Sequence, residues 1–127
     1  MANEHHHETL IKGIAKEQKL ILDKSGQAIY IYLDDTHKIC NKKFADLLGY
    51  KSLSAWVAYE TPLDDVIEKD QPKVIEAYTR ASEKLEAVSL PVTFKNVKTG
   101  KLIKGRVLMA PLEYEGHVFV IFFIEEI

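Results

Sequence analysis

The chain contains, near its C-terminus, the stretch Val118-Phe119-Val120-Ile121-Phe122-Phe123-Ile124, which has no polar residue. An unbroken run of β-branched and aromatic residues predicts a β-strand. A strand with one side in solvent would alternate polar and apolar residues, so both sides of this strand must be covered. We therefore expect it to be the central strand of its sheet, with a core or pocket on one face and a helix or partner chain on the other.

The length and composition indicate one globular domain, because 127 residues with 46% hydrophobic and 28% charged side chains suit a single core. Seventeen basic and nineteen acidic residues give a formal net charge of −2, which argues against a nucleic-acid or anionic-membrane partner. The lone Cys40 cannot form an internal disulfide, and the sequence shows neither a signal peptide nor an apolar run long enough to span a bilayer. We expect a cytoplasmic protein.

Residues 1–8 are polar and include His5-His6-His7. Adjacent residues on a flexible terminus cannot preset a coordination geometry, so we predict a disordered or tag-like N-terminus and no metal site. Apolar residues at helical spacing, among them Ile14 and Ile21, then predict an amphipathic flanking helix over residues 9–22. Its apolar stripe would either pack on the outer face of the sheet or form a dimer contact.

Residues 23–127 carry alternating strand, helix and turn signals. The pattern predicts strands at 27–33, 37–40, 90–97, 102–112 and 117–125. It predicts a helix that ends at Leu48 after an Asn41 N-cap, short helices at 52–59 and 63–67, and a long helix from an Asp70 N-cap to about residue 84.

Three segments resemble PAS sensor domains. The run Ile39-Cys40-Asn41-Lys42-Lys43-Phe44-Ala45-Asp46-Leu47-Leu48-Gly49-Tyr50 is similar to the family's strand-to-helix signature, in which an Asn follows a short strand, a Phe faces the core and Gly-Tyr closes the helix. Residues 66–74 resemble the start of the family's long helix, and residues 90–125 resemble its closing three-stranded meander. The resemblance implies an α+β fold over residues 23–127, with a five-stranded antiparallel sheet, small helices on its concave face and the flanking helix on its outer face.

The resemblance also implies a hollow between sheet and helices, which in many members holds a small molecule. With the register taken from the resemblance, we expect the residues lining it to be Phe44, Trp56, Tyr78, Thr93, Lys95, Gly105, Val107, Met109, Phe119, Ile121 and Phe123. The outer face would carry Val118, Val120, Phe122 and Ile124, opposite Ile14 and Ile21. An apolar lining fits a ligand site and a filled core alike, and the small size of the domain favours a filled or nearly filled core.

The resemblance gives no positive indication of a cofactor. Flavin-binding light sensors of the family carry amide side chains at the positions of Lys95, Gly105 and Phe123, none of which offers a carboxamide here, and a reactive Cys in a segment that lacks one in this chain. Haem-binding members often use a His on or near the long helix, and residues 70–85 contain none. We expect neither flavin nor haem and leave the cofactor unknown. Cys40 is predicted to pack in the core rather than to act as a nucleophile.

The sequence shows no hydrolytic, phosphate-binding or paired-cysteine motif, so we predict no enzymatic activity. It favours a PAS-type sensory or regulatory module in signal transduction, which binds a small apolar or amphipathic ligand or forms a homodimer, and acts on a signalling protein or an output domain. The alternative is an interaction module with a filled core, whose function is dimerisation through its outer face.

Overall fold

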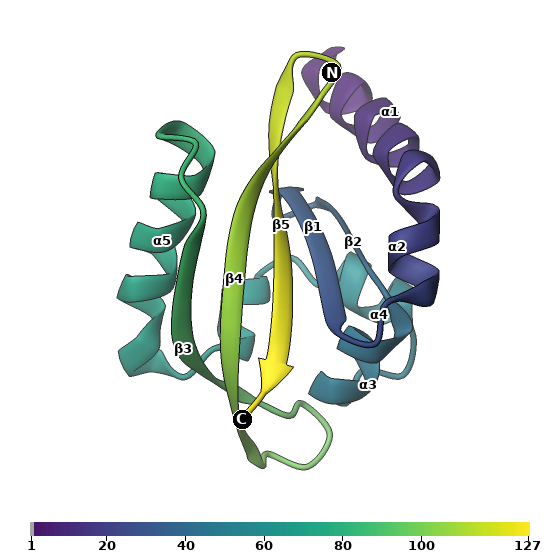
Figure 1. Cartoon of the computed structure of the whole chain (residues 1–127). Coiled ribbons are helices and arrows are strands. Elements are labelled where there is room, and N and C mark those ends of the chain that lie inside the picture. Colours follow the sequence, from purple (N-terminus) through teal and green to yellow (C-terminus); the bar gives the residue numbers. More distant parts are fainter. Residues whose placement is uncertain (1) are drawn as a thin grey trace.

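A computed structural model describes residues 2–127, with side chains from residue 6 onward. Its centre is one five-stranded sheet with the strand order β2-β1-β5-β4-β3, in which all neighbouring strands are antiparallel (Figure 1). The strands are β1 (Ala28–Asp34), β2 (His37–Cys40), β3 (Val88–Lys95), β4 (Leu102–Tyr114) and β5 (His117–Glu126). The apolar stretch that begins at Val118 lies in β5, the middle strand, as predicted.

Helices cover both faces of the sheet. On the outer face lie α1 (Ala2–Glu17) and α2 (Lys19–Lys24), which Figure 1 shows in purple and dark blue. On the inner face lie α3 (Lys42–Leu48), α4 (Leu53–Ala58), the short 3₁₀ helices η1 (Pro62–Asp65) and η2 (Glu68–Asp70), and the long α5 (Gln71–Glu83). The predicted α+β architecture is therefore confirmed.

The flanking helix begins well before residue 9. Residues 2–8, which the sequence predicted to be disordered, form the first turns of α1. The reason lies in tertiary contacts that hydrophobic periodicity does not reveal: His7 hydrogen-bonds with Asp34 at the end of β1, and His6 with His117 at the start of β5. Polar side chains thus hold this part of the helix against the sheet.

The apolar residues form two clusters, one on each side of the sheet. On the outer side, Ile14 of α1 is fully buried and packs on a cluster that includes Ile29, Ile31, Phe119 and Ile121. Of the two alternatives for the apolar stripe of this helix, the structure has the first: the stripe packs on the outer face of its own sheet and not on a partner chain. Ile21 is different, because it lies on α2 and is 37% exposed.

The inner cluster shows that the predicted faces of β5 were wrong by one residue. Val120, Phe122 and Ile124, predicted on the outer face, pack in the inner core, whereas Phe119, Ile121 and Phe123 belong to the outer cluster. Val118 is half-buried at the start of the strand. A strand that is apolar on both sides carries no alternation, so its pattern cannot fix which residues face inward.

The same one-residue error affects β3, where Val92 and Phe94 are in the inner core in place of Thr93 and Lys95. On β4 the prediction was right, because Val107 and Met109 are buried there. This strand alternates buried and exposed residues from Leu102 to Met109, and the register taken from the resemblance gave its faces correctly.

The two predicted helix caps had different outcomes. Asn41 caps α3 as predicted, since its Oδ1 accepts from the backbone N–H of Phe44 at 3.0 Å. Asp70 makes no side-chain cap bond to α5, and its Oδ2 accepts instead from the N–H of Thr93 on β3 at 2.8 Å. The preceding 3₁₀ turn gives Asp70 helical backbone angles, φ −91° and ψ −13°, rather than the extended angles of an N-cap.

Candidate functional site

The inner core is not completely filled, because a cavity of about 260 Å³ lies between β1, β5 and the inner helices. We call it the hollow. It is lined by Tyr30, Tyr32, Asp35, Phe44, Trp56, Pro62, Leu63, Asp65, Val66, Val74, Ile75, Tyr78, Phe94 and Phe122.

Aromatic side chains make up the main wall of the hollow. The ring of Tyr30 stacks on Phe122 with centroids 4.0 Å apart and an interplanar angle of 12°. Phe44 and Trp56 lie 4.8 and 5.0 Å from Tyr30, centroid to centroid. Tyr30 comes from β1, Phe122 from β5 and the other two from α3 and α4, so the wall exists only in the folded domain.

A buried carboxyl group, Asp65, lies at one end of this wall. Its Oδ1 accepts from the hydroxyl of Tyr50 at 2.6 Å, and its Oδ2 accepts from the indole Nε1 of Trp56 at 3.2 Å. Burial raises the pKa of Asp65 to about 6, although both hydrogen bonds act in the opposite direction. The hollow therefore contains a group that titrates near neutral pH.

A buried ammonium group, on Lys38 of β2, braces α4 behind the wall. Its Nζ donates to the carbonyl oxygens of Asp35, Val57 and Tyr59 at 2.5, 3.0 and 2.6 Å. It also lies 5.1 Å from the centre of the Trp56 ring. Three acceptors require three N–H groups, so this geometry needs the charged ammonium form, even though burial lowers its pKa.

The raised pKa of Asp65 gives a testable pH dependence. Between about pH 4 and 6 the folded chain holds a proton on Asp65 that the unfolded chain has lost, so this group's contribution to stability falls as the pH rises through that window. The free energy of unfolding of the wild type minus that of Asp65→Asn should fall by roughly 2 kcal/mol from pH 4 to pH 7. Urea denaturation at several pH values measures this difference.

The neighbouring Asp64 provides the control. Hydrogen bonds from Thr61 and Tyr59 lower its pKa, so its contribution is present above its ordinary pKa and is lost only as the pH falls below about 4. The free energy of unfolding of the wild type minus that of Asp64→Asn should not change from pH 5 to pH 7. If Asp64→Asn and Asp65→Asn give parallel curves, Asp65 is not the group that titrates.

The structure brings together only part of the predicted lining. Phe44, Trp56 and Tyr78 line the hollow, and Val107 and Met109 pack in the core beside it. Phe119, Ile121 and Phe123 lie on the opposite face of the sheet, as described above, and Lys95 is exposed at the end of β3.

Sequence reasoning missed Tyr30, Phe94, Phe122 and Asp65. For Tyr30 a signal existed, because Tyr and Ile alternate along β1 and separate its two faces. For Asp65 none existed, since a carboxylate in a Pro- and Asp-containing turn is indistinguishable in sequence from a solvated one.

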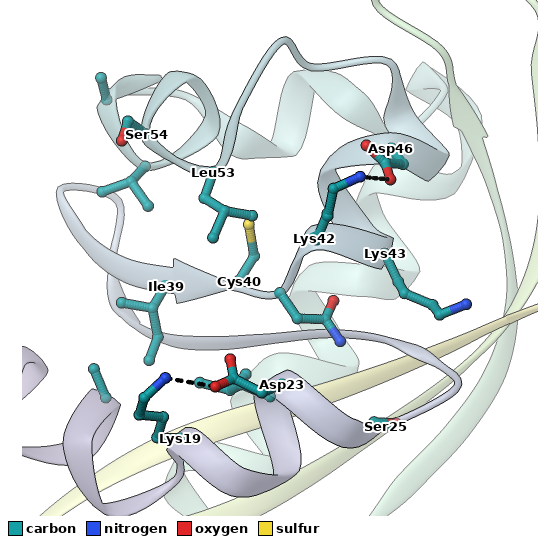
Figure 2. Close-up of a pocket in the computed structure, with 15 residues that line it drawn as sticks. Lys19, Asp23, Ser25, Ile39, Cys40, Lys42, Lys43, Asp46, Leu53 and Ser54 are labelled. Atoms are coloured by element: carbon teal, nitrogen blue, oxygen red, sulfur yellow. Dashed lines mark hydrogen bonds and ion pairs between the residues drawn. The ribbon is translucent and has the colours of Figure 1, made fainter.

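A larger groove of about 860 Å³ lies between α2, β2, α3 and α4. Figure 2 shows that its ion pairs, Lys19 with Asp23 and Lys42 with Asp46, each join two residues of one helix, and all four side chains are exposed. Cys40 borders this groove but is buried, and burial raises the pKa of its thiol to about 12, so it is protonated at neutral pH. The hollow, with buried aromatic and polar groups, is the better candidate site.

Comparison with known proteins rests on structure alone, because no model of a protein family and no curated protein matches the sequence. The PAS domain of an HTR-like protein from Haloarcula marismortui superposes with a TM-score of 0.69 at 17% identity, covering 97% of this chain and 99% of that one. The chain has the PAS fold.

Two further solved structures show the same likeness. A domain of a sensory box sensor histidine kinase/response regulator from Geobacter sulfurreducens superposes on this chain with a TM-score of 0.65 at 11% identity, covering 91% and 96% of the two chains. A LOV protein from Rhodobacter sphaeroides gives a TM-score of 0.68 at 10% identity, covering 91% of this chain and 68% of that one.

The corrected register changes the residues on which the flavin argument rests. The inward residues in that part of the sheet are Phe94, Gly105 and Phe122, in place of Lys95, Gly105 and Phe123. None of the three carries a carboxamide, so the absence of flavin stays a prediction on corrected grounds.

Within residues 2–127, no helix is long and apolar enough to cross a bilayer.

Proposed function

We propose that this PAS domain is a non-enzymatic sensory module in signal transduction that binds a small amphipathic ligand in the hollow. The observation that carries the proposal is the 260 Å³ cavity with aromatic walls and the buried carboxyl group of Asp65. Structures of similar fold come from an HTR-like protein and a sensory box histidine kinase, which supports a role in signalling.

The volume and walls of the hollow limit the class of ligand. An engineered apolar cavity of about 150 Å³ takes up benzene, so a hollow of this size suits a single ring with a short substituent. Asp35 and Asp65 are the charged residues among those that line it, and the lining contains no basic side chain. Aromatic faces and carboxylates both attract a cation, so we propose a small aromatic amine.

The tryptophan at position 56 makes this proposal measurable, because the chain has one Trp and it lines the hollow. We would titrate the protein with phenethylamine and, separately, with phenylacetate, which has a similar ring and the opposite charge. Trp fluorescence excited at wavelengths that neither probe absorbs should change and saturate with the amine. Phenylacetate should bind at least tenfold more weakly, since it would meet Asp35 and Asp65.

Matched variants connect the signal to the hollow. Val74 is buried and lines the hollow from α5, so Val74→Phe reduces its volume and should weaken phenethylamine binding at least tenfold. Leu108→Phe, on the outer face of the sheet, should leave binding unchanged. If neither probe changes the Trp56 signal, or if both variants respond equally, the hollow is not the binding site.

The sheet gives the hollow a direct physical connection to the flanking helix. On β1, Tyr30 and Tyr32 face the hollow, while Ile29 and Ile31, which alternate with them, pack in the cluster that contains Ile14 of α1. A ligand that displaces the Tyr30 ring would therefore bias the packing of α1 if that packing has two arrangements. We propose that this is how occupancy reaches a signalling partner or an output domain.

The second candidate function is dimerisation, and one observation favours it. The outer face of β4 exposes Leu102 and Leu108, at 56% and 40%, while Ile14 is used inside the chain. A homodimer would therefore form through β4, not through the predicted set of Val120, Phe122 and Ile124. Sedimentation over a range of concentrations tests this: Leu108→Asp should shift a dimer to monomer, and a wild type that is monomeric throughout would exclude the second function.

A further inference from the structure

Four histidines and one aspartate gather at one end of the domain, and none of the five lines the hollow. Figure 1 shows the start of α1 beside the hairpin that joins β4 and β5. His6 and His7 are on α1, and His117 is the first residue of β5. Asp34 ends β1 and His37 begins β2, so a neighbouring turn brings them to the same place.

Three of these residues form a compact donor set. His7 Nδ1 lies 2.9 Å from Asp34 Oδ2, and His37 Nδ1 lies 2.7 Å from Asp34 Oδ1. One donor atom from each of the three lies within 4.8 Å of the other two, and all three side chains are partly buried. A metal ion would replace the protons that the two imidazoles now share with the carboxylate.

The carboxylate is held in place by its own turn. The backbone N–H and the hydroxyl of Thr36 both donate to Asp34 Oδ1, at 3.0 and 3.1 Å. Such outer hydrogen bonds orient metal-binding carboxylates.

A second pair of donors lies beside this set. His6 Nε2 and His117 Nε2 are 3.0 Å apart, and the rings of His7 and His117 are 6.1 Å apart between centroids. His117 therefore lies next to the three-residue set, but the pair is outside the group of donor atoms that all lie within 4.8 Å of one another.

We propose that His7, Asp34 and His37 bind a divalent transition-metal ion of the zinc class, with the neighbouring His117 as the fourth ligand. Imidazole and carboxylate are the donors that Zn²⁺ takes in four-coordinate sites, and this donor set contains no thiolate. The prediction of no metal site considered the N-terminal histidines alone, whereas the fold adds donors from β1, β2 and β5. The bound ion would fasten α1 to the sheet.

The test uses the full chain, stripped of metal and titrated with ZnCl₂ by calorimetry and by thermal melting. We expect one ion per chain and a rise in the melting temperature, because an ion that joins α1 to the sheet stabilises the folded state only. His37→Gln and Asp34→Asn should each weaken zinc binding at least tenfold and abolish the rise. Glu8→Gln, an exposed change beside the histidines that lies outside the donor set, should leave both unchanged.

Zinc binding that His37→Gln does not alter would overturn the proposal, because the N-terminal histidines would then bind the ion by themselves. A chain that shows no zinc binding overturns it equally. An imidazole ¹H–¹⁵N spectrum of the wild type keeps the test valid if a variant folds poorly. Zinc should shift the ring nitrogens of both His7 and His37, and an unshifted His37 would contradict the site.

Discussion

Replacing Phe122 with Ala should lower the free energy of unfolding by about 3–5 kcal/mol. Phe122 is 4% exposed on the inner face of β5, and its ring stacks on Tyr30 at 4.0 Å. The change removes this contact and adds to the volume of the hollow. The neighbouring side chains already border empty space, so they cannot move in to fill the gap. Urea denaturation of both proteins at one pH measures the loss.

The adjacent residue provides a matched control for the corrected register. Phe123 has the same side chain but is only partly buried, in the outer cluster. Phe123→Ala should lower the free energy of unfolding by about 1–2 kcal/mol, because a partly buried ring contributes less buried apolar area than a fully buried one. If the order is reversed and Phe123→Ala costs more, the sequence-based faces were right and the structural ones are wrong.

The second large effect is expected for Lys38→Met, which should lower the free energy of unfolding by about 3 kcal/mol. Met has a similar length, so packing against Trp56 is largely kept, but the carbonyl oxygens of Asp35, Val57 and Tyr59 lose their donor. Relief of the buried charge offsets part of the cost, which is why the expected value lies below the sum for three unpaired carbonyls.

Lys42→Met is the control for that change. Lys42 forms an ion pair with Asp46 one helical turn away, and its side chain is 84% exposed. Exposed pairs of this kind contribute about 0.3–0.5 kcal/mol, so the variant should be close to the wild type. A similar small loss for Lys38→Met would show that the buried ammonium group does not brace α4.

Most of the fold could be predicted because its local signals agree with each other. Asn41, Phe44 and Gly49 mark the start, the buried side and the end of α3, and each has that role in the structure. The unbroken apolar run that begins at Val118 identified the central strand for the same physical reason, since only a doubly covered strand can dispense with polar residues.

The faces of β5 could not be predicted, and this limited the prediction of the site. Alternation of Tyr and Ile separates the faces of β1, but β5 is apolar at every position from Val118 to Ile124. Its register is fixed by pairing, with Phe122 opposite Met109 and Tyr30 opposite Phe122, and pairing is a property of the whole sheet. An error of one residue therefore placed Phe119, Ile121 and Phe123 in the predicted lining, although they lie on the other side of the sheet.

The histidine cluster shows a second limit of reading the chain in order. His7, His37 and His117 are far apart in sequence, and none follows a metal-binding spacing. The antiparallel topology brings the end of β1 and the start of β5 to the same end of the sheet, and α1 reaches that end from the outer face. Such donor sets can be found only once the topology is known.

The most direct test of the central claim, that the hollow binds a small ligand, is an amide ¹H–¹⁵N spectrum recorded during titration with phenethylamine. The indole N–H of Trp56, which donates to Asp65 at 3.2 Å, gives a single reporter inside the site. We expect saturable shifts of this signal and of the Tyr30, Val74 and Phe122 amides, with Lys98 and Thr99 in the β3–β4 turn unmoved. Shifts confined to other surfaces, or no saturable shift of the Trp56 indole, would contradict the claim.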